Sequence, residues 1–451
     1  MKKQNKIVYN YYGDSKDIFS LLKDYDWPIY LCSNHDTFKN QRYDIITCLP
    51  IQKIYAFSKK TIVETKDTKK EYFDDPIEVL NKIMKNYTSD ISDIPFTGGA
   101  IGYISYDLGN EYEHINTKNL EPDIPLLAFG IYDWAIIVDH FNKNTILLYE
   151  NEDSIVKDIK KHLENSSFDK YKPNSYSIDS ECKSNLSYDE YKKRFKKIQS
   201  YIKSGDCYQI NFSQRFSLSY SGDTWDIYNT ISPTYSSPYS AYLKTPFIDI
   251  MSFSPERFLS YDNGIVETKP IKGTRPVSEN PKDNIKALTE LSSSYKEKAE
   301  NLMIVDLLRN DLGKNCEFGS VKVTKLFDIE TFANVHHLVS TVQGKISDSS
   351  NIFKLIHGCF PGGSITGAPK IRAMQIINEL EPDNRSIYCG SIGYISSNGQ
   401  TDLNIAIRTV AATTDKLFFW GGGGIVYDSD VESEYKETLD KIKPLLNIFD
   451  N

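Results

Sequence analysis

Residues 258–268 read FLSYDNGIVET, two short apolar runs joined by Asn263-Gly264. Asn and Gly tolerate the positive φ angles that a two-residue β-hairpin turn requires. A second such pair, Asn398-Gly399, separates the apolar residues 394–395 from residues 403–405. Two-residue turns join antiparallel strands, because parallel strands need a long crossover connection. These two segments therefore predict antiparallel sheets.

A well-marked helix is predicted between Ser187 and Gly205. Ser187 and Glu190, three residues apart, form a capping box, and Gly205 is a favourable residue at a helix end. The apolar residues between them recur at spacings of three and four, which places them on one helical face: Tyr188, Tyr191, Phe195, Ile198 and Ile202. Helical patterns also occur near residues 294–310, 369–380 and 430–447. Helices packed on antiparallel sheets give a fold of the α+β class.

The first 150 residues alternate short apolar runs with turns, as in residues 45–49 and 134–138, which indicates strands. Residues 165–186 are polar, rich in Ser and Asn, and lack periodicity, so we predict a linker there. The chain then divides into an amino-terminal region, residues 1–175, and a second region, residues 176–451.

The composition excludes several classes of protein. The 53 basic and 61 acidic side chains give a net charge of −8, which argues against nucleic-acid binding because that needs a basic face. No apolar run approaches the roughly 18–20 residues of a membrane span, and the basic start lacks an apolar signal core. The seven cysteines are widely spaced without a C-x-x-C pair, which is typical of reduced thiols. We therefore expect a cytoplasmic protein that binds neither membrane nor nucleic acid.

Residues 268–276, TKPIKGTRP, follow a predicted strand, and Pro270 and Gly273 are suited to a turn at its end. Lys272 projects from this turn. A lysine in a partly desolvated site loses its proton more readily and serves as a nucleophile or base. The alternative is a solvated surface lysine.

Residues 362–370, GGSITGAPK, place three glycines before a helix that starts near Pro369. Free backbone N–H groups at a helix start bind anions, so a carboxylate or phosphate ligand is one interpretation. The order of residues matches neither a Walker loop nor G-x-G-x-x-G. The alternative is a tight loop whose glycines serve its geometry alone.

A set of carboxylates indicates a metal site. Glu434 and Glu437 are three residues apart, hence neighbours on one helix face, and Lys441 is one turn further along. Glu300 lies in another predicted helix, residues 296–310. Converging carboxylates without His or Cys suit a hard cation such as Mg²⁺. The alternative is a solvated helix face.

Two further side chains have acid–base chemistry. Glu256 stands in SFSPERF and His337 in VHHLVS, and each is a candidate acid or base. For Glu256 the alternative is a structural charge pair with Arg257. For His337 it is a packing role, as adjacent histidines often have.

Together these segments resemble the chorismate-binding enzymes, which include the large subunits of anthranilate synthase and aminodeoxychorismate synthase, and isochorismate and salicylate synthases. The amino-terminal half matches less strongly, through FTGGAIGYISYDLG and residues 26–33. Eight motifs carry the resemblance, in this order between residues 187 and 445: YQINFSQR, SFSPERF, KPIKGTRP, AENLMIVDLLRNDLG, VHHLVS, PGGSITGAPK, IAIRTV and GGGGIVYDSDVESEYKET.

The resemblance implies a fold, a cofactor and a set of site residues. The fold has two large antiparallel sheets packed against each other with helices outside, in α/β/β/α layers as in anthranilate synthase large subunits. Residues 1–175 would form its amino-terminal region and residues 176–451 the chorismate-binding catalytic region. Mg²⁺ would be held by Glu300, Glu434 and Glu437, and Glu256, Lys272 and His337 would be catalytic. The positions matching substrate contacts are Gln209, Gly273, Thr274, Tyr388, Arg408, Gly422, Gly424 and Lys441.

Lys272 and Gln209 discriminate within the family. Most of its branches carry Ala in place of Lys272, whereas P-I-K-G-T resembles aminodeoxychorismate synthase component I, in which this lysine attacks C2 of chorismate. Members that add water carry a lysine at Gln209, and an amide cannot deprotonate water. The expected reaction is chorismate plus ammonia to 4-amino-4-deoxychorismate, toward p-aminobenzoate and folate.

The resemblance also implies a partner, since the chain has no G-x-C-x-G-x-Q segment for glutamine hydrolysis. A separate glutamine amidotransferase subunit would supply the ammonia in a heterodimer.

Three alternatives stay open at this point. Related large subunits hold tryptophan near a serine that Ser33 loosely matches, although a plain strand explains that segment equally simply. The two other assignments are an anthranilate synthase component I and a non-catalytic tryptophan-binding regulatory subunit. Lys272 argues against the first, and the full set of site residues argues against the second.

Overall fold

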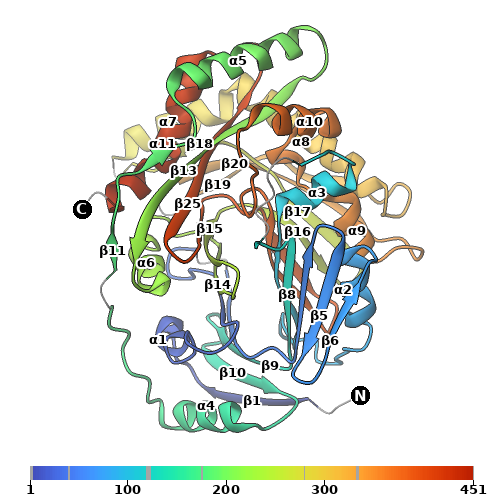
Figure 1. The fold of residues 1–451 in the computed structure, drawn as a ribbon, viewed down its shortest axis with the longest axis vertical. Helices are drawn as coiled ribbons and strands as arrows, with labels where there is room; N and C mark the ends of the chain where they lie inside the picture. Colours follow the sequence, from blue (N-terminus) through green and yellow to red (C-terminus); the bar gives the residue numbers. More distant parts are fainter. Residues whose placement is uncertain are drawn as a thin grey trace.

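The computed structural model describes residues 4–38, 41–117, 123–173, 176–278, 280–331 and 335–449. They form two large sheets with helices on the outside (Figure 1). Every strand pair within these ranges is antiparallel, for example β16 with β17 and β22 with β23. The predicted α+β fold with antiparallel sheets is therefore confirmed.

The first sheet has 13 strands. Its order is β1 (Asn5–Asn10), β10 (Asn144–Tyr149), β9 (Trp134–Asp139), β3 (Tyr43–Thr47), β2 (Ile29–Cys32), β14 (Tyr239–Lys244), β15 (Asp249–Ser254), β24 (Thr409–Ala412), β25 (Lys416–Ile425), β13 (Gln209–Ser221) and β11 (Ser177–Ile178). Two short strands also pair with β13, namely β12 (Lys183–Ser184) and β21 (Gly367–Ala368).

The second sheet has 12 strands. Its order is β18 (Ile271–Pro276), β20 (Val335–Lys345), β17 (Ile265–Lys269), β16 (Arg257–Asp262), β23 (Thr401–Asn404), β22 (Ser391–Ser396), β7 (Gly99–Ile104), β8 (Leu127–Tyr132), β4 (Gln52–Phe57), β5 (Lys60–Thr65) and β6 (Lys69–Tyr72), and β19 (Lys322–Thr331) pairs with β20. Both sheets combine strands from before and after the predicted boundary at residues 175 and 176, because β2 pairs with β14 and β7 with β22. That boundary stays a prediction.

The helices pack around these sheets. They are α1 (Ser15–Ser20), α2 (Pro76–Met84), α3 (Tyr106–Tyr112), α4 (Ser154–Asn165), α5 (Tyr188–Lys203), α6 (Thr224–Ile231), α7 (Pro281–Ser293), α8 (Tyr295–Gly313), α9 (Ile352–Cys359), α10 (Lys370–Leu380) and α11 (Val431–Phe449), with a 3-10 turn at Gly363–Ile365. Among the described helices, none has the length and apolar character to span a membrane.

The helix start predicted at Ser187 and the hairpin turn predicted at Asn263-Gly264 are both confirmed. The Ser187 hydroxyl accepts a hydrogen bond from the Glu190 amide, and the Glu190 carboxylate accepts one from the Ser187 amide, so the capping box starts α5. Asn263 and Gly264 have φ angles of 48° and 84° between β16 and β17. The structure differs at residues 165–186, where β11 and β12 replace part of the expected linker. They pair with β13, whose edge would otherwise leave backbone hydrogen-bonding groups without partners.

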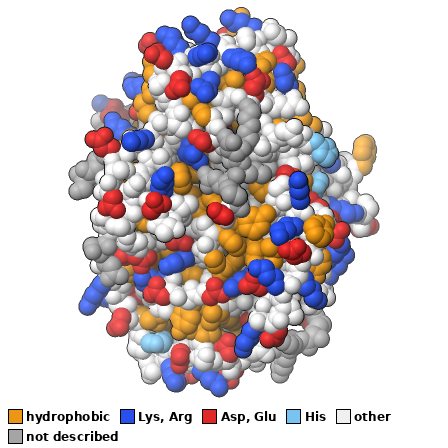
Figure 2. Space-filling view, in the orientation of Figure 1, with side chains coloured by type: hydrophobic (Ala, Val, Ile, Leu, Met, Phe, Trp, Pro, Cys, Tyr) orange, Lys and Arg blue, Asp and Glu red, His pale blue; other side chains and the backbone are white. Residues whose placement is uncertain are grey.

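Four clusters of buried apolar residues hold the described layers together, and two of them are large. One contains buried residues of both sheets, such as Ile250 and Ala411 from the first and Ile54 and Ile101 from the second, which shows that the sheets face each other. Another lies on the opposite face of the first sheet under helices, and includes Trp225 of α6. Charges of both signs are spread over the face in Figure 2.

Glycines 421–424 of β25 let α11 lie directly on the strand. A Cβ atom at Gly421 would overlap the carbonyl oxygen of Thr438 in α11. On its other edge, β25 pairs with β13 over residues 416–425. The strand and helix are therefore closer than any residue larger than glycine permits at this point.

We predict that Gly421→Ala lowers the free energy of unfolding by roughly 1–3 kcal/mol, because the strand and α11 must separate to admit the methyl group. Urea unfolding followed by circular dichroism measures the change. Gly313→Ala at the end of α8 is the matched control, since no atom lies within 4 Å of the added Cβ. Equal losses in both variants would show that the close approach does not limit stability.

Candidate active site

The site residues come from both sheets and meet where β13, β25, α8 and α11 gather, in the upper half of Figure 1. Lys272 in β18 of the second sheet donates a hydrogen bond from Nζ to the carbonyl of Ser364 at 3.4 Å. Residue 364 belongs to the glycine-rich loop that continues into β21, and β21 pairs with Gln209 at the start of β13. Segments far apart in the chain are thus joined at one place.

Lys272 is half-buried rather than a solvated surface lysine. Burial lowers the pKa of its ammonium group, whereas the carboxylates of Glu256 and Glu300 act in the opposite direction and raise it. Burial prevails, so the pKa of Lys272 lies below its ordinary value. A larger fraction of this side chain is therefore a neutral amine, which is the nucleophilic form.

Glu256 is 6% exposed and lies close to Lys272. Burial raises the pKa of its carboxyl group, although Ser364 and Lys272 partly oppose the shift. A raised pKa favours the protonated carboxyl group, which is the form that a general acid needs. The alternative charge pair with Arg257 is not present, because Arg257 instead donates to both Asp402 oxygens at 3.0 and 2.9 Å and to Glu267 at 2.9 Å.

The two histidines have different surroundings. His337 is buried opposite Thr274 in the β18–β20 pairing, and its Nδ1 lies 3.1 Å from the Thr274 hydroxyl. Burial, with a contribution from Arg408, lowers the pKa of His337 to about 4. The ring is therefore neutral at pH 7 and can accept a proton or a hydrogen bond. His336 packs structurally, since both its ring nitrogens contact side-chain oxygens at 2.8 Å.

Arg408 provides a positive charge without a countercharge. It lies between β23 and β24 and has a φ of 50°, a left-handed conformation that is uncommon outside glycine. Within the described ranges no carboxylate forms an ion pair with it, and its neighbour is the Tyr235 ring at 5.9 Å. A half-buried guanidinium without a countercharge is suited to bind the carboxylate of a ligand.

Glu434 and Glu437 of α11 both face Gly423. A Cβ atom there would lie 3.2 Å from Oε2 of Glu434 and 3.3 Å from Oε1 of Glu437, so the glycine leaves this space open. Lys441 Nζ lies 2.7 Å from Oε1 of Glu437 and donates to the Gly422 carbonyl at 2.7 Å. Partial burial works against ionisation of Glu437, but Lys441 outweighs it and lowers the pKa.

Glu300 on α8 completes the acidic group. Burial raises its pKa, while Lys272 and Lys296 act in the opposite direction. Lys296 was not among the predicted site residues, yet its charge acts on Glu300, Glu434 and Glu437 alike. Its spacing of four residues from Glu300 in a predicted helix is the signal that could have identified it.

The donor atoms of this group suit a hard cation. Within the described part of the chain, no three His, Cys, Asp or Glu side chains are close enough together to hold a metal ion by themselves. Glu300, Glu434 and Glu437 offer only carboxylate oxygens, and Mg²⁺ commonly uses few protein ligands and keeps several waters. The donor set therefore fits Mg²⁺, which stays a prediction.

Gln209 and Tyr388 extend the site beside the glycines of β25. Gln209 is 1% exposed, and neither its amide oxygen nor its amide nitrogen has a hydrogen-bond partner within the described residues. An unsatisfied buried polar group costs about 1–3 kcal/mol, so a ligand or water is expected there. The amide lies against Gly424, and the hydroxyl of Tyr388 would be 3.0 Å from a Cβ atom at Gly422. Gln209 and Tyr388 occupy the space that the absent side chains of Gly424 and Gly422 leave free.

The glycine-rich loop is held by a buried ion pair between Glu381 and Arg385. Arg385 donates to the carbonyls of Ile365 and Asn211 at 2.8 and 2.6 Å. A Cβ atom at Gly367, where φ is +148°, would overlap the Gln209 carbonyl, so the geometry of the loop requires glycine at this position. Anion binding by the loop stays a prediction. The sequence analysis also missed Ser364, which contacts both Lys272 and Glu256.

Ser33 lies just beyond β2 in the amino-terminal region. Its amide and hydroxyl both donate to Oδ1 of Asp44 at 2.8 Å. Asp44 also accepts a hydrogen bond from Ser15 and lies 3.0 Å from the His140 ring. The Ser33 hydroxyl is therefore engaged by the protein itself, and the tryptophan pocket stays a prediction.

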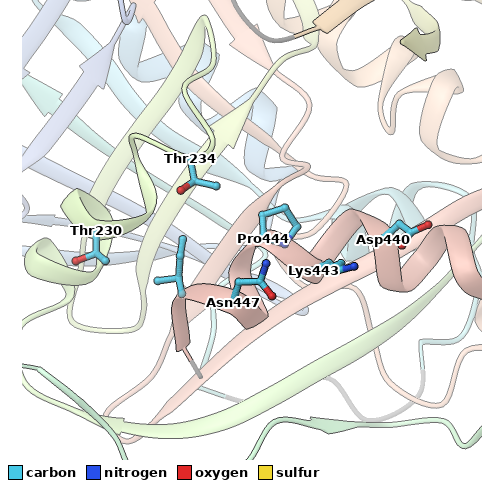
Figure 3. Close-up of a pocket in the computed structure, with 7 residues that line it drawn as sticks. Thr230, Thr234, Asp440, Lys443, Pro444 and Asn447 are labelled. Atoms are coloured by element: carbon cyan, nitrogen blue, oxygen red, sulfur yellow. The ribbon is translucent and has the colours of Figure 1, made fainter. Parts of the chain in front are cut away.

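A hollow of about 580 Å³ lies elsewhere, between α6 and α11 (Figure 3). None of the predicted site residues lines it. Its lining residues are Thr230, Thr234, Asp440, Lys443, Pro444, Asn447 and Ile448. This hollow is therefore separate from the group of residues described above.

Known proteins are similar to this chain over most of its length. A family model described as chorismate binding enzyme matches residues 36–447. Aminodeoxychorismate synthase component 1 of Escherichia coli (strain K12) is 42% identical over 435 residues, which are 95% of this chain and 94% of that protein. Anthranilate synthase component 1 of Acetivibrio thermocellus is 35% identical over 431 residues, 90% of this chain and 86% of that protein.

A solved structure shows the same fold. The crystal structure of anthranilate synthase component I from Streptococcus pneumoniae TIGR4 has a TM-score of 0.80 and 32% identity to this chain. The match covers 90% of this chain and 92% of that one. The predicted likeness to anthranilate synthase large subunits is confirmed.

We predict that His337 makes the protein less stable in acid. Its folded pKa of about 4 lies below the ordinary 6.5, so the unfolded state binds more protons between these values. The free energy of unfolding should therefore fall by about 2–3 kcal/mol from this residue as pH drops from 7 to 4.5. Urea unfolding at both pH values measures it, and His337→Gln should lack that part of the loss. Identical pH dependence in both proteins would contradict the shift.

Proposed function

The chain belongs to the chorismate-binding enzyme family, and from this premise we propose that it is component I of an aminodeoxychorismate synthase. It would join ammonia to chorismate and form 4-amino-4-deoxychorismate in the cytoplasm, on the route to p-aminobenzoate and folate. The observation that carries the proposal is Lys272, held half-buried beside Glu256 in the P-I-K-G-T segment. The Escherichia coli relative that is 42% identical to this chain bears the name of this activity.

Lys272 and Glu256 supply the first half of the reaction. The neutral amine attacks C2 of the ring, so that a C2–N bond forms and the two ring double bonds each shift toward C4. The C4–O bond breaks, and the proton of Glu256 lets the hydroxyl group leave as water. The product of this step is a covalent adduct on Lys272, and Glu256 is left ionised.

Ammonia completes the reaction at C4. A C4–N bond forms, the double bonds shift back, and the C2–N bond breaks to return the lysine amine. The surplus proton of the added nitrogen returns to Glu256. The route places nitrogen at C4, whereas direct addition at C2 would lead toward anthranilate.

Other residues would hold the substrate and would favour ammonia over water as the nucleophile. Arg408 would pair with a chorismate carboxylate, since no protein carboxylate of the described chain neutralises it. Gln209 offers an amide oxygen that accepts a hydrogen bond from ammonia but cannot deprotonate water. This arrangement supports amination over hydration to isochorismate.

Glu300, Glu434 and Glu437 would hold Mg²⁺. When bound, the cation neutralises the ring carboxylate and stabilises the charge that develops as the C4 hydroxyl leaves. Lys441 and Lys296 lower the pKa of Glu437, which favours its ionised form. The open space at Gly423 is where both α11 carboxylates point.

A separate glutamine amidotransferase would supply the ammonia. The word component in the relatives' names implies a second subunit for those enzymes. A glutamine-hydrolysing thiol must ionise readily. Here, burial raises the pKa of most of the thiols, namely Cys32, Cys48, Cys207, Cys316, Cys359 and Cys389.

The two alternative functions account for fewer of the observed site residues. Likeness to anthranilate synthase component I favours that enzyme, but it leaves Lys272 and its contact with Ser364 without a role. A non-catalytic tryptophan-binding subunit leaves the convergence of Glu256, Lys272 and the acidic group unexplained.

We predict that the purified chain with chorismate, Mg²⁺ and high ammonium forms 4-amino-4-deoxychorismate, identified by chromatography and mass spectrometry. Lys272→Ala should lower the rate at least about 100-fold, because the covalent route is lost, which is roughly 2.7 kcal/mol of transition-state stabilisation. Without ammonia, the wild type should carry a chorismate-derived adduct on the peptide containing Lys272.

Lys269→Ala is the matched control, since Lys269 ends β17 just before the strand of Lys272 and its Nζ donates to Glu330 at 2.8 Å. It should keep the wild-type rate and product. Anthranilate or isochorismate as the main product would overturn the assignment. A Lys272→Ala rate close to that of the wild type would rule out the covalent route.

We predict that Glu300→Gln and Glu437→Gln weaken Mg²⁺ binding and lower activity by about 2–4 kcal/mol of transition-state stabilisation, because each removes one anionic oxygen ligand. Titration of activity with Mg²⁺ and calorimetry with Mg²⁺ alone measure the two effects. Glu432→Gln on the exposed side of the first turn of α11 is the control. Full activity of either variant at limiting Mg²⁺ would remove that residue from the set of ligands.

A further inference from the structure

The turn between β25 and α11 holds a serine whose hydroxyl has only one possible orientation. The amide of Val426 donates to Ser429 Oγ at 3.0 Å, and Ser429 Oγ lies 2.6 Å from Oε1 of Glu434. An amide N–H can only donate, so Ser429 must use a lone pair toward Val426. Its single hydrogen is then directed to Glu434, which accepts it as a short charge-assisted hydrogen bond.

This turn is fixed on both sides. The Ser429 amide donates back to the Val426 carbonyl at 3.1 Å, which closes the turn on itself. The same carbonyl accepts a hydrogen bond at 2.8 Å from the side chain of Gln199 on α5. Ser429 is therefore held by backbone groups and by a neighbouring helix, and it does not depend on Glu434 for its own position.

The consequence for Glu434 is a fixed carboxylate plane. Oε1 is engaged by Ser429, and Oε2 is the atom that faces the open space at Gly423, next to Oε1 of Glu437. Glu434 is only 6% exposed, so water does not compete freely for its orientation. A carboxylate that is free to rotate would lose conformational entropy on binding a cation, whereas this one is already oriented.

We propose that Ser429 is a positioning residue that presents the free oxygen of Glu434 to a divalent cation. The inference rests on the metal role in the proposed function and adds a residue outside the predicted ligands. Side chains that hydrogen-bond to metal ligands commonly account for 10–100-fold in metal affinity. Ser429 would act through Glu434 without touching the cation.

The test measures binding of Mn²⁺ alone, by the electron paramagnetic resonance signal of the free ion, so that activity is not needed. Ser429→Ala should weaken Mn²⁺ binding at least about tenfold, and Ser429→Thr, which keeps the hydroxyl, should restore most of it. Ser433→Ala is the matched control, because the Ser433 hydroxyl bonds Asp430 at 3.0 Å in the same helix start without contacting Glu434. Urea midpoints equal to that of the wild type would show that the fold is intact.

The outcomes separate this inference from the proposed function. Wild-type protein and Ser433→Ala should bind Mn²⁺ equally, and Glu434→Gln should lose affinity. If Glu434→Gln weakens binding but Ser429→Ala does not, the positioning role is overturned and the metal site stands. If the wild type binds no Mn²⁺, the metal role and this inference fall together.

Discussion

The site depends on one constraint, the direct contact between the glycine run of β25 and the backbone of α11. At Gly421 the contact is close enough that a methyl group would overlap Thr438, so the helix axis is fixed relative to the strand. With the axis fixed, the side chains of Glu434 and Glu437 point into the space that Gly423 leaves open. On the other face of the strand, Gly422 and Gly424 leave room for Tyr388 and Gln209. A strand with ordinary side chains would fill this volume with protein.

The second sheet supplies the candidate nucleophile and the acid–base side chains of the site. Lys272, Glu256 and His337 belong to strands and turns of that sheet, while the carboxylates belong to helices at its border with the first. Their separation is therefore set by how the two sheets pack and by the loop that Glu381 and Arg385 hold between them. Burial acts on Lys272 and Glu256 in opposite senses, favouring the neutral form of each. These shifts favour the neutral amine of Lys272 and the protonated carboxyl group of Glu256, the forms that the proposed reaction uses.

Local signals in the sequence were sufficient for much of the fold. Asn263-Gly264 and the Ser187 capping box each act within a few residues, so their structures follow from backbone geometry alone. The spacing of Glu434, Glu437 and Lys441 similarly defines a helix face. Partners distant in the chain were not predictable this way. Ser364 and Ser429 act through hydrogen bonds to Lys272 and Glu434, and nothing in their own segments signals those contacts. The strands at residues 177–178 and 183–184 were missed because the edge of β13, not their composition, makes them strands.

The interleaving of early and late strands in both sheets affects how the chain folds during its synthesis on the ribosome. Strand β7 pairs with β22, and β2 pairs with β14. Each of these early strands can complete its pairing only after the later strand has been translated. During that interval their edges expose unpaired amide and carbonyl groups, which are templates for association with other chains. Contacts between distant segments also form slowly, since a long loop must close first. Neither half of the chain alone therefore contains a complete sheet.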